Sequence, residues 1–174
     1  RDKMKFFENS EDSEDFLRKD GNSNNVLFLP AFNGLGAPYW NSEIRGGFYG
    51  ITQDTSIEDM TTAAFQSVAF QTKDITNILS LYDIKIQKLL VDGGMVSNKI
   101  FCQVLADTLQ IEIVTPKNVE STAIGACKVA MLSSGMNIEN LSKNEISYKA
   151  NKDRRDVYFR NYSKWQEYLL NTIK

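Results

Sequence analysis

Short apolar runs and longer segments with helical periodicity alternate along the first half of the chain. Residues 26–30 form a continuous apolar run that ends at a proline, and residues 45–51 form a second run that contains glycines; both predict strands. Ser56 can cap a helix, and Asp59, three residues later, completes the pattern of a capping box. We expect this helix to extend to about Leu81. The apolar positions at helical spacing that would form its buried face are Ile57, Met60, Ala64, Val68, Ile75, Ile78 and Leu79.

The second half of the chain repeats this alternation. Residues 84–91 first alternate and then become fully apolar, which predicts a strand that enters a covered sheet. The remaining predicted elements are a helix over 99–109, a strand over 111–114, a helix that opens over 120–126 and ends near Gly135, and an amphipathic terminal helix that follows a polar connector within 137–174. Strands that alternate with helices predict an α/β fold with a mostly covered sheet, and 174 residues suffice for one domain with its own core.

A change in composition near residue 25 divides the chain. Residues 1–25 are polar and acidic, and a loop rich in glycine and asparagine closes them. The chain begins with Arg1 and has no signal-peptide pattern, so we expect these residues to be a polar lead-in from a preceding portion of a longer protein. Residues 26–174 would then form the folded lobe.

Composition mainly excludes classes of chemistry. The chain is 42% hydrophobic and 24% charged, with a net charge of -2, so its charge indicates neither nucleic acid nor an anionic membrane as a partner. No apolar run approaches the roughly 20 residues of a membrane helix. The absence of histidine excludes Ser-His-Asp and Cys-His catalysis and His-ligated zinc. Cys102 and Cys127 lie in apolar segments without CxxC spacing, which predicts buried free thiols in a reducing, cytoplasmic compartment.

The stretch from Leu89 to Asn98 is the strongest candidate for binding chemistry. An apolar run ends in Asp92, Gly93 and Gly94 follow, and a helical segment begins. Glycine lets bare backbone approach a phosphate or a nucleoside, and the Asn98 amide can both donate and accept hydrogen bonds. A tight strand-to-helix connection, with Asn98 as a local cap or a solvent-facing residue, explains the same pattern. Neither GxGxxG nor GxxxxGK[ST] occurs, so neither a Rossmann nor a P-loop site is indicated.

A second distinctive segment, residues 34–40, combines two glycines and a proline with two aromatic residues. It contains no nucleophile and no acid–base pair. We therefore expect an ordered loop that supports the structure or a domain contact, with Trp40 buried against the sheet.

Several motifs together resemble the FGGY family of carbohydrate kinases. The pattern G-x-F-x-G-I at residues 46–51, followed after seven residues by D-M-x-x-A-A-F-Q at residues 59–66, matches the second signature of that family position by position. VDGG at residues 91–94 and TAIGA at residues 122–126 lie where the family has its nucleotide-side motifs. Within the family, the segment PAFNGLGAPYW at residues 30–40 is similar to that of the glycerol kinases.

This resemblance, which covers about residues 1–165, implies both a fold and an activity. It implies a C-terminal lobe of α/β class with a ribonuclease-H-like core, of the actin/Hsp70/sugar-kinase superfamily, in which helices flank a mixed sheet. The whole enzyme would transfer the γ-phosphoryl group of ATP to glycerol with the help of Mg²⁺. Gly94 and Asn98 match the family's nucleotide contacts, and Gly93 supports the same turn. Residues 122–126 would pack beside the hinge.

The departures from the family pattern limit what this chain can do. It lacks the Gly-Asp-Gln motif that carries the family's catalytic aspartate, and the family's glycerol-binding residues belong upstream of Arg1. Gln66 stands where glycerol kinases usually carry glutamate. We therefore expect one wall of an ATP cleft, with no catalytic residue and no metal ligand of its own. Mg²⁺ and glycerol would be bound mainly by the missing N-terminal lobe, and the chain alone would be inactive.

Two alternatives remain open. The chain could be a lobe of another FGGY polyol or sugar kinase, or a free-standing nucleotide-binding module without catalysis. Aromatic residues near the C-terminus leave a homo-oligomer of the full enzyme open as well.

Overall fold

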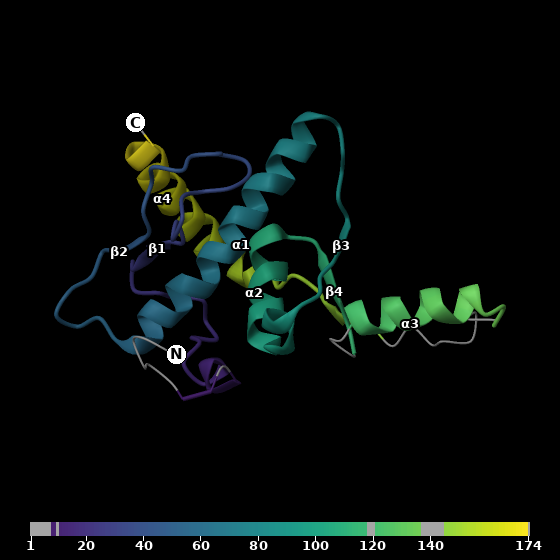
Figure 1. The fold of residues 1–174 in the computed structure, drawn as a ribbon. Helices are drawn as coiled ribbons and strands as arrows, with labels where there is room; N and C mark the ends of the chain where they lie inside the picture. The colour runs from purple at the N-terminus through teal and green to yellow at the C-terminus, as the bar shows by residue number, and fades with distance from the viewer. Residues whose placement is uncertain (1–7, 10, 118–120, 137–144, 174) are drawn as a thin grey trace.

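The computed structural model describes residues 8–9, 11–117, 121–136 and 145–173, in which helices and strands alternate (Figure 1). The strands are β1 (Leu27–Leu29), β2 (Gly47–Tyr49), β3 (Lys88–Leu90), β4 (Glu112–Pro116) and β5 (Glu145–Tyr148). The α-helices are α1 (Ile57–Leu81), α2 (Lys99–Leu109), α3 (Ser121–Ser133) and α4 (Arg155–Ile173). Short 3₁₀-helices are η1 (Glu11–Glu14), η2 (Gly94–Ser97) and η3 (Lys152–Arg154). Residue 120, where the sequence predicts that the third helix opens, lies outside the described residues.

The strands form two separate sheets. β1 and β2 pair antiparallel, with Leu27 opposite Tyr49. The second sheet has the order β3-β4-β5, in which β3 runs parallel to β4 and β5 runs antiparallel to it. The sequence pattern predicts a connector where β5 lies. This strand is missed because only Ile146 and Tyr148 are apolar in its four residues and three of the four are exposed, so no alternation is long enough to detect.

Helix α1 begins and ends at the predicted residues, and its capping box is confirmed. Asp59 N donates to Ser56 Oγ at 3.3 Å, and Ser56 N donates to Asp59 Oδ2 at 3.0 Å. Arg18 Nε lies 2.7 Å from Asp59 Oδ1, which also accepts from Asn24 Nδ2 at 2.9 Å. Burial alone would raise the pKa of Asp59, but the Ser56 and Asn24 hydrogen bonds and the Arg18 charge outweigh it and lower the pKa. The carboxylate therefore stays ionised at the positive end of α1.

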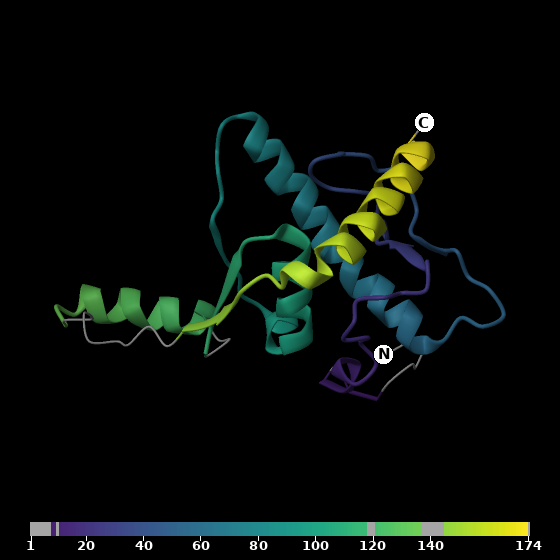
Figure 2. The same ribbon diagram turned by 180° about the vertical axis from the view of Figure 1, so that it is seen from behind.

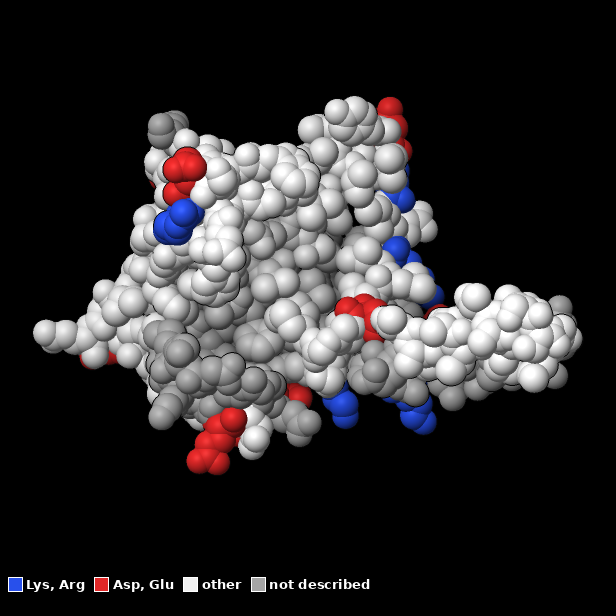
Figure 3. Space-filling view, viewed as in Figure 1, with Lys and Arg blue, Asp and Glu red and all other residues white. Residues whose placement is uncertain are grey.

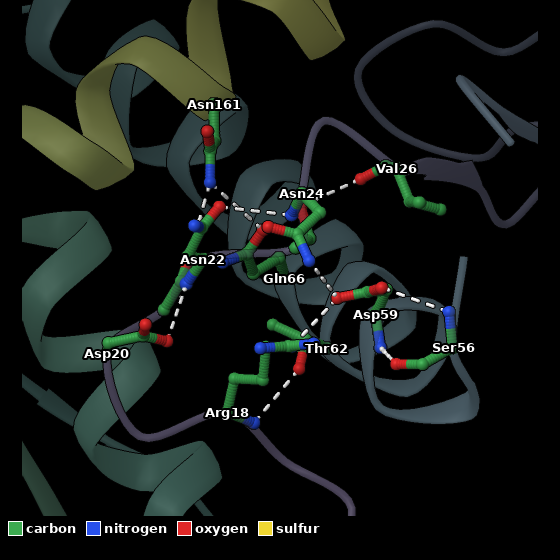
Figure 4. Close-up of polar contacts among 12 residues, drawn as sticks. Arg18, Asp20, Asn22, Asn24, Val26, Ser56, Asp59, Thr62, Gln66 and Asn161 are labelled. Carbon is green, nitrogen blue, oxygen red and sulfur yellow. Dashed lines mark hydrogen bonds and ion pairs between the residues drawn. The ribbon is translucent and has the colours of Figure 1, made fainter. Parts of the chain in front are cut away.

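Residues 18–24 cross α1 and α4 and are fixed to both (Figure 4). Gly21 O accepts a hydrogen bond from Gln66 Nε2 at 2.7 Å and another from Asn161 Nδ2 at 3.3 Å. Gln66, the departure from the glycerol kinase pattern, is thus a buried structural amide. These contacts make residues 18–24 part of the packed body. The division of the chain at residue 25 stays a prediction.

Two hydrophobic clusters lie on α1, which crosses the middle of the molecule in both views (Figures 1 and 2). The first joins α1 to β1, the loop after it and α4: Leu29, Ala31, Leu35, Ile44, Phe70, Tyr162, Trp165 and Leu169. The second joins α1 to α2, β4 and α4: Ala69, Phe101, Val104, Leu105, Ala106, Leu109, Ile113 and Tyr158. The predicted buried face of α1 is wrong: none of its seven positions is buried, and Ile57, Ile75 and Ile78 are exposed. The buried positions of the helix include Ala69 and Phe70 instead, which serve two cores and not one.

The covered sheet predicted around residues 84–91 is wrong for the described part of the chain. β3 is an edge strand, and Leu90 is 68% exposed. Leu89 and Val91, which alternate with Leu90, do pack on the second cluster. One face of β3 is therefore covered, while the opposite face, which carries Leu90, is not.

The two cysteines differ in environment. Both are free; Cys102 is buried as predicted, whereas Cys127 is exposed on α3. α3 projects from the rest of the molecule in both views, so an apolar sequence there does not ensure burial (Figures 1 and 2). None of the described helices combines the length and the apolar character that crossing a membrane requires.

Candidate functional site

The predicted binding turn lies after β3, where the chain passes through Val91 and Asp92 into η2. Gly93 has a φ of +109°, which residues with a side chain rarely adopt, so this position requires glycine. A Cβ atom added at Gly93 or at Gly94 would meet no other atom within 4 Å. Both glycines are exposed, so their backbone is open to a ligand.

Asn98 is the N-cap of α2 and is only 8% exposed. Its Oδ1 accepts a hydrogen bond from Phe101 N at 2.9 Å, which confirms the local-cap interpretation of this residue. Its Nδ2 is buried and has no hydrogen-bond partner among the described residues. The side chain therefore uses its oxygen locally and retains an unused donor, which is costly to bury.

A hollow of about 300 Å³ opens beside the turn. Its lining comes from the turn, from α1 and from α2: Val68, Thr72, Val91, Asp92, Gly93, Gly94, Met95, Val96, Phe101 and Leu105. Asn98 does not line it. The sequence places Val68 on the buried face of α1, but no pattern connects Val68 or Thr72 to the turn, because α1 and the turn meet only in the folded chain.

The turn presents backbone groups that could bind a ligand, but it carries no nucleophile and no acid–base pair. Asp92 carries the one ionisable side chain of the hollow's lining. Cys102, nearby, donates from Sγ to Val96 O at 3.3 Å, and burial raises its pKa to about 11, so the thiol is protonated at neutral pH. In the described ranges, no group of three or more Cys, Asp and Glu side chains could hold a metal ion. The arrangement can hold a ligand through backbone and amide groups.

The loop at residues 34–40 is ordered, as predicted, but its aromatic residues are placed differently. Trp40 is 79% exposed and has a φ of +48°, which turns it away from the sheet, so the expectation of a buried Trp40 is wrong. Tyr39 points inward instead, and its hydroxyl donates to Asp74 Oδ2 at 2.8 Å. Burial, together with the Asp74 carboxylate, raises the pKa of Tyr39. Asp74 Oδ1 also accepts from Tyr162 at 2.5 Å and thereby joins the loop to α4.

The segment at residues 122–126 lies on α3. Thr122 and Ala123 are exposed there, and they line neither the hollow nor the two hydrophobic clusters. Their packing beside a hinge stays a prediction.

Comparison with protein families gives one match over most of the chain. Residues 4–134 match the model described as "FGGY family of carbohydrate kinases, C-terminal domain". A glycerol kinase of Marinomonas sp. (strain MWYL1) is 38% identical over 152 residues, which is 87% of this chain and 31% of the relative. A glycerol kinase of Streptococcus pneumoniae is 45% identical over 136 residues, 78% of this chain and 27% of the relative. The chain thus spans about a third of the length of these relatives.

Solved structures agree with the sequence relatives. The glycerol kinase of Plasmodium falciparum, solved with ADP, matches 99% of this chain and 35% of its own with a TM-score of 0.83 and 28% identity. A xylulose kinase of Lactobacillus acidophilus matches 90% of this chain and 32% of its own with a TM-score of 0.72 and 23% identity, which shows the fold alone.

The predicted fold class is confirmed: the chain is an α/β lobe of the actin/Hsp70/sugar-kinase superfamily, with a mixed sheet and flanking helices. The family signature at residues 46–51 and 59–66 now falls on β2 and on the capped start of α1. On these grounds the chain belongs to the FGGY family of carbohydrate kinases and corresponds to its C-terminal domain.

Proposed function

We propose that this chain is the C-terminal lobe of an ATP-dependent glycerol kinase, which converts ATP and glycerol to ADP and glycerol 3-phosphate. In this proposal the lobe forms one wall of the ATP cleft. The match to the FGGY C-terminal domain and the glycerol kinases at 38% and 45% identity support it. The neighbour solved with ADP supports a nucleotide as the ligand.

The observation that carries the proposal is the unused amide of Asn98 beside an open glycine turn. A buried N–H group without a partner costs about 1–3 kcal/mol. A ring nitrogen of a purine or a ribose oxygen would accept from Asn98 Nδ2 and remove that cost. Gly94, whose added Cβ would meet nothing, leaves room for the nucleotide to approach the backbone, and Gly93 gives the turn its shape.

The proposed lobe binds and orients the nucleotide, and other parts of the enzyme perform the transfer. Phosphoryl transfer requires several groups that neutralise charge and align the acceptor at once. The sequence lacks the Gly-Asp-Gln motif, and no carboxylate cluster in the described ranges fits Mg²⁺. We therefore assign the base, the glycerol contacts and the main Mg²⁺ ligands to the portion of the enzyme outside this chain.

Asn98→Asp is expected to weaken ADP binding by about tenfold or more, which corresponds to about 1.4 kcal/mol. The carboxylate keeps the acceptor that caps α2, because Asp caps as well as Asn does, but it removes the donor and adds a negative charge. Gly94→Val is expected to weaken binding similarly by filling the approach to the backbone. The measurement is an NMR titration of the chain with ADP that follows the backbone amides of the turn and the side-chain amides.

Gly36→Val is the matched control for Gly94→Val. Gly36 is also exposed, also has open space around its Cβ position and also lacks a positive φ, but it lies in the loop at residues 34–40. It should leave ADP binding unchanged, and urea unfolding should show that all three variants fold. If Asn98→Asp and Gly94→Val bind ADP as the parent chain does, the nucleotide is not held at this turn.

The chain alone is expected to release no ADP in a coupled assay with ATP, Mg²⁺ and glycerol. The physical reason is the absence of the catalytic carboxylate from its sequence. The Streptococcus pneumoniae enzyme, assayed in parallel, shows that the coupling system works. Glycerol-dependent turnover by the chain would overturn the proposal that its partner lobe supplies the chemistry.

A further inference from the structure

The turn at Gly93 and Gly94 has one buried anchor. Neither glycine has another atom within 4 Å of its Cβ position, and both are exposed. Val96, in contrast, is 7% exposed and is the one buried residue of η2. It lies between the glycines and Asn98, where α2 begins. A contact that fixes Val96 therefore fixes the spacing between the backbone of the turn and the amide of Asn98.

The backbone of Val96 is held by a buried thiol. Cys102, on α2, is fully buried, and its Sγ donates to Val96 O at 3.3 Å. Its backbone N donates to Asn98 O at 3.2 Å, so the same residue is bonded to both ends of this short segment. The other bond of Val96 is local, since its N donates to Gly93 O at 3.1 Å. The thiol therefore joins the turn to the body of α2.

The thiol is the end of a longer chain of hydrogen bonds. The hydroxyl of Tyr148, on β5, donates to Cys102 Sγ and accepts from the hydroxyl of Thr115, on β4. Thr115 is 2% exposed, so the chain starts in the interior. Hydrogen bonds in such a chain polarise one another and fix the orientation of their members. The β4–β5 ladder is thereby connected, through Cys102, to the carbonyl of Val96.

Placement matters because charge contributes little to binding at the turn. On the face shown in Figure 3, charged side chains lie mainly around the rim, and the centre carries few. Asp92, the one ionisable side chain that lines the hollow beside the turn, is acidic and repels a phosphate group. Binding would then depend on neutral donors, namely the backbone of Gly94 and Asn98 Nδ2. Hydrogen bonds from such donors weaken steeply when they are misaligned.

We propose that Cys102 is a positioning residue for nucleotide binding and that Tyr148 orients its thiol. The thiol holds Val96 O and so keeps the Gly94 backbone and Asn98 Nδ2 at a spacing that one nucleotide can span. Cys102 does not line the hollow, and its one S–H proton is donated to Val96 O, so it acts through the turn and not on the ligand. The inference rests on the proposed function, because it takes the turn as a nucleotide-binding wall.

The test is an NMR titration with ADP of the parent chain and of two variants at this position. Cys102→Ala removes the donor and should weaken ADP binding by about threefold to tenfold, the equivalent of one hydrogen bond. It should also shift the Val96 carbonyl signal and the Asn98 side-chain amide signals before ADP is added. Cys102→Ser keeps a donor, so its signals should lie closer to those of the parent chain and its ADP affinity should fall less.

A third variant tests the hydrogen-bonded chain behind the thiol. Tyr148→Phe removes the hydroxyl that donates to Cys102 Sγ but leaves the thiol in place. It should shift the Val96 carbonyl signal in the same direction as Cys102→Ala does, by a smaller amount, because the remaining thiol is less firmly oriented.

Two controls separate positioning from packing. Val104, on the same helix, is 3% exposed and has no polar side-chain atom. Val104→Ala should lower the melting temperature by several degrees and leave ADP affinity unchanged where the variant is folded. Cys127→Ser, at the exposed free thiol of α3, should change neither quantity.

Equal ADP affinity of Cys102→Ala and the parent chain overturns the inference, and it contradicts this inference alone if Asn98→Asp does weaken binding. Equal weakening by Val104→Ala also overturns it, because lost packing then accounts for the effect. A parent chain that binds no ADP contradicts the proposed function. The ligand-free signals of Val96 and Asn98 then decide alone whether the thiol positions the turn, and unchanged signals in Cys102→Ala overturn that claim.

Discussion

Trp165→Ala is expected to lower the free energy of unfolding by about 3–5 kcal/mol, the range for removing a buried aromatic side chain. Trp165 is 2% exposed in the first cluster, where its ring centroid lies 5.8 Å from that of Phe70. Its Nε1 donates to Phe28 O at 2.8 Å, so the substitution also leaves a carbonyl of β1 without that donor. Urea unfolding followed by far-UV circular dichroism measures the change.

The second tryptophan provides the control. Trp40 is 79% exposed, and Trp40→Ala should change the free energy of unfolding by less than about 0.5 kcal/mol. The two variants also separate the fluorescence signals, since the buried ring should emit at shorter wavelength and resist quenching. Equal destabilisation by the two substitutions would contradict the placement of α4 on β1.

Asp59→Ala is expected to cost about 1–3 kcal/mol, the range for leaving buried hydrogen-bonding groups without their partner, because solvent reaches Arg18 and screens its charge. The carboxylate is fully buried, and it accepts from Ser56 N and Asn24 Nδ2 while it pairs with Arg18. Its loss removes the acceptor of Ser56 N in the capping box, although Ser56 still caps α1, and leaves the Arg18 charge without its partner. Urea unfolding at neutral pH measures the effect.

The same residue makes stability depend on pH in a definite direction. Because the folded-state pKa of Asp59 lies below its ordinary value of 3.8, its contribution is complete above about pH 4 and is lost as the pH falls through the folded-state pKa. Asp59→Asn should therefore flatten the acid limb of the stability curve relative to the parent chain. Asp83→Asn, at an exposed position just beyond the other end of α1, should leave that limb unchanged. An identical acid limb in Asp59→Asn would contradict the ion pair.

The helices were predictable because their signals are local. The Ser56–Asp59 capping box and the apolar spacing after it determine where α1 begins, and α2 follows from the same kind of periodicity. β5 could not be predicted, because its pairing with β4 and not its own sequence makes it a strand. The exposure of Leu90 could not be predicted either, since an apolar run indicates a strand but not whether that strand lies at the edge of its sheet.

Some features of the candidate site could likewise be predicted from the sequence, and others depend on the folded chain. The two glycines are visible in the sequence because a turn with positive φ requires one. The environment of Asn98 is not visible, because both its burial and the engagement of its Oδ1 depend on where α2 begins. The hollow is a tertiary feature, made when Val68 and Thr72 of α1 meet a turn some twenty residues away in sequence. The prediction of a buried Trp40 failed because backbone conformation, which the sequence did not reveal, decides which of two adjacent aromatic residues turns inward, and here it is Tyr39.

Helix α1 serves both hydrophobic clusters through adjacent residues, Ala69 in one and Phe70 in the other. If either cluster unfolds, it exposes one face of α1, and the other cluster packs on the same helix. The two sheets, although they share no hydrogen-bonded ladder, should behave as a single cooperative folding unit. Damage to the first cluster would then loosen the turn at Gly93 through α1, the helix that both clusters share, and distance from the binding turn would not protect it.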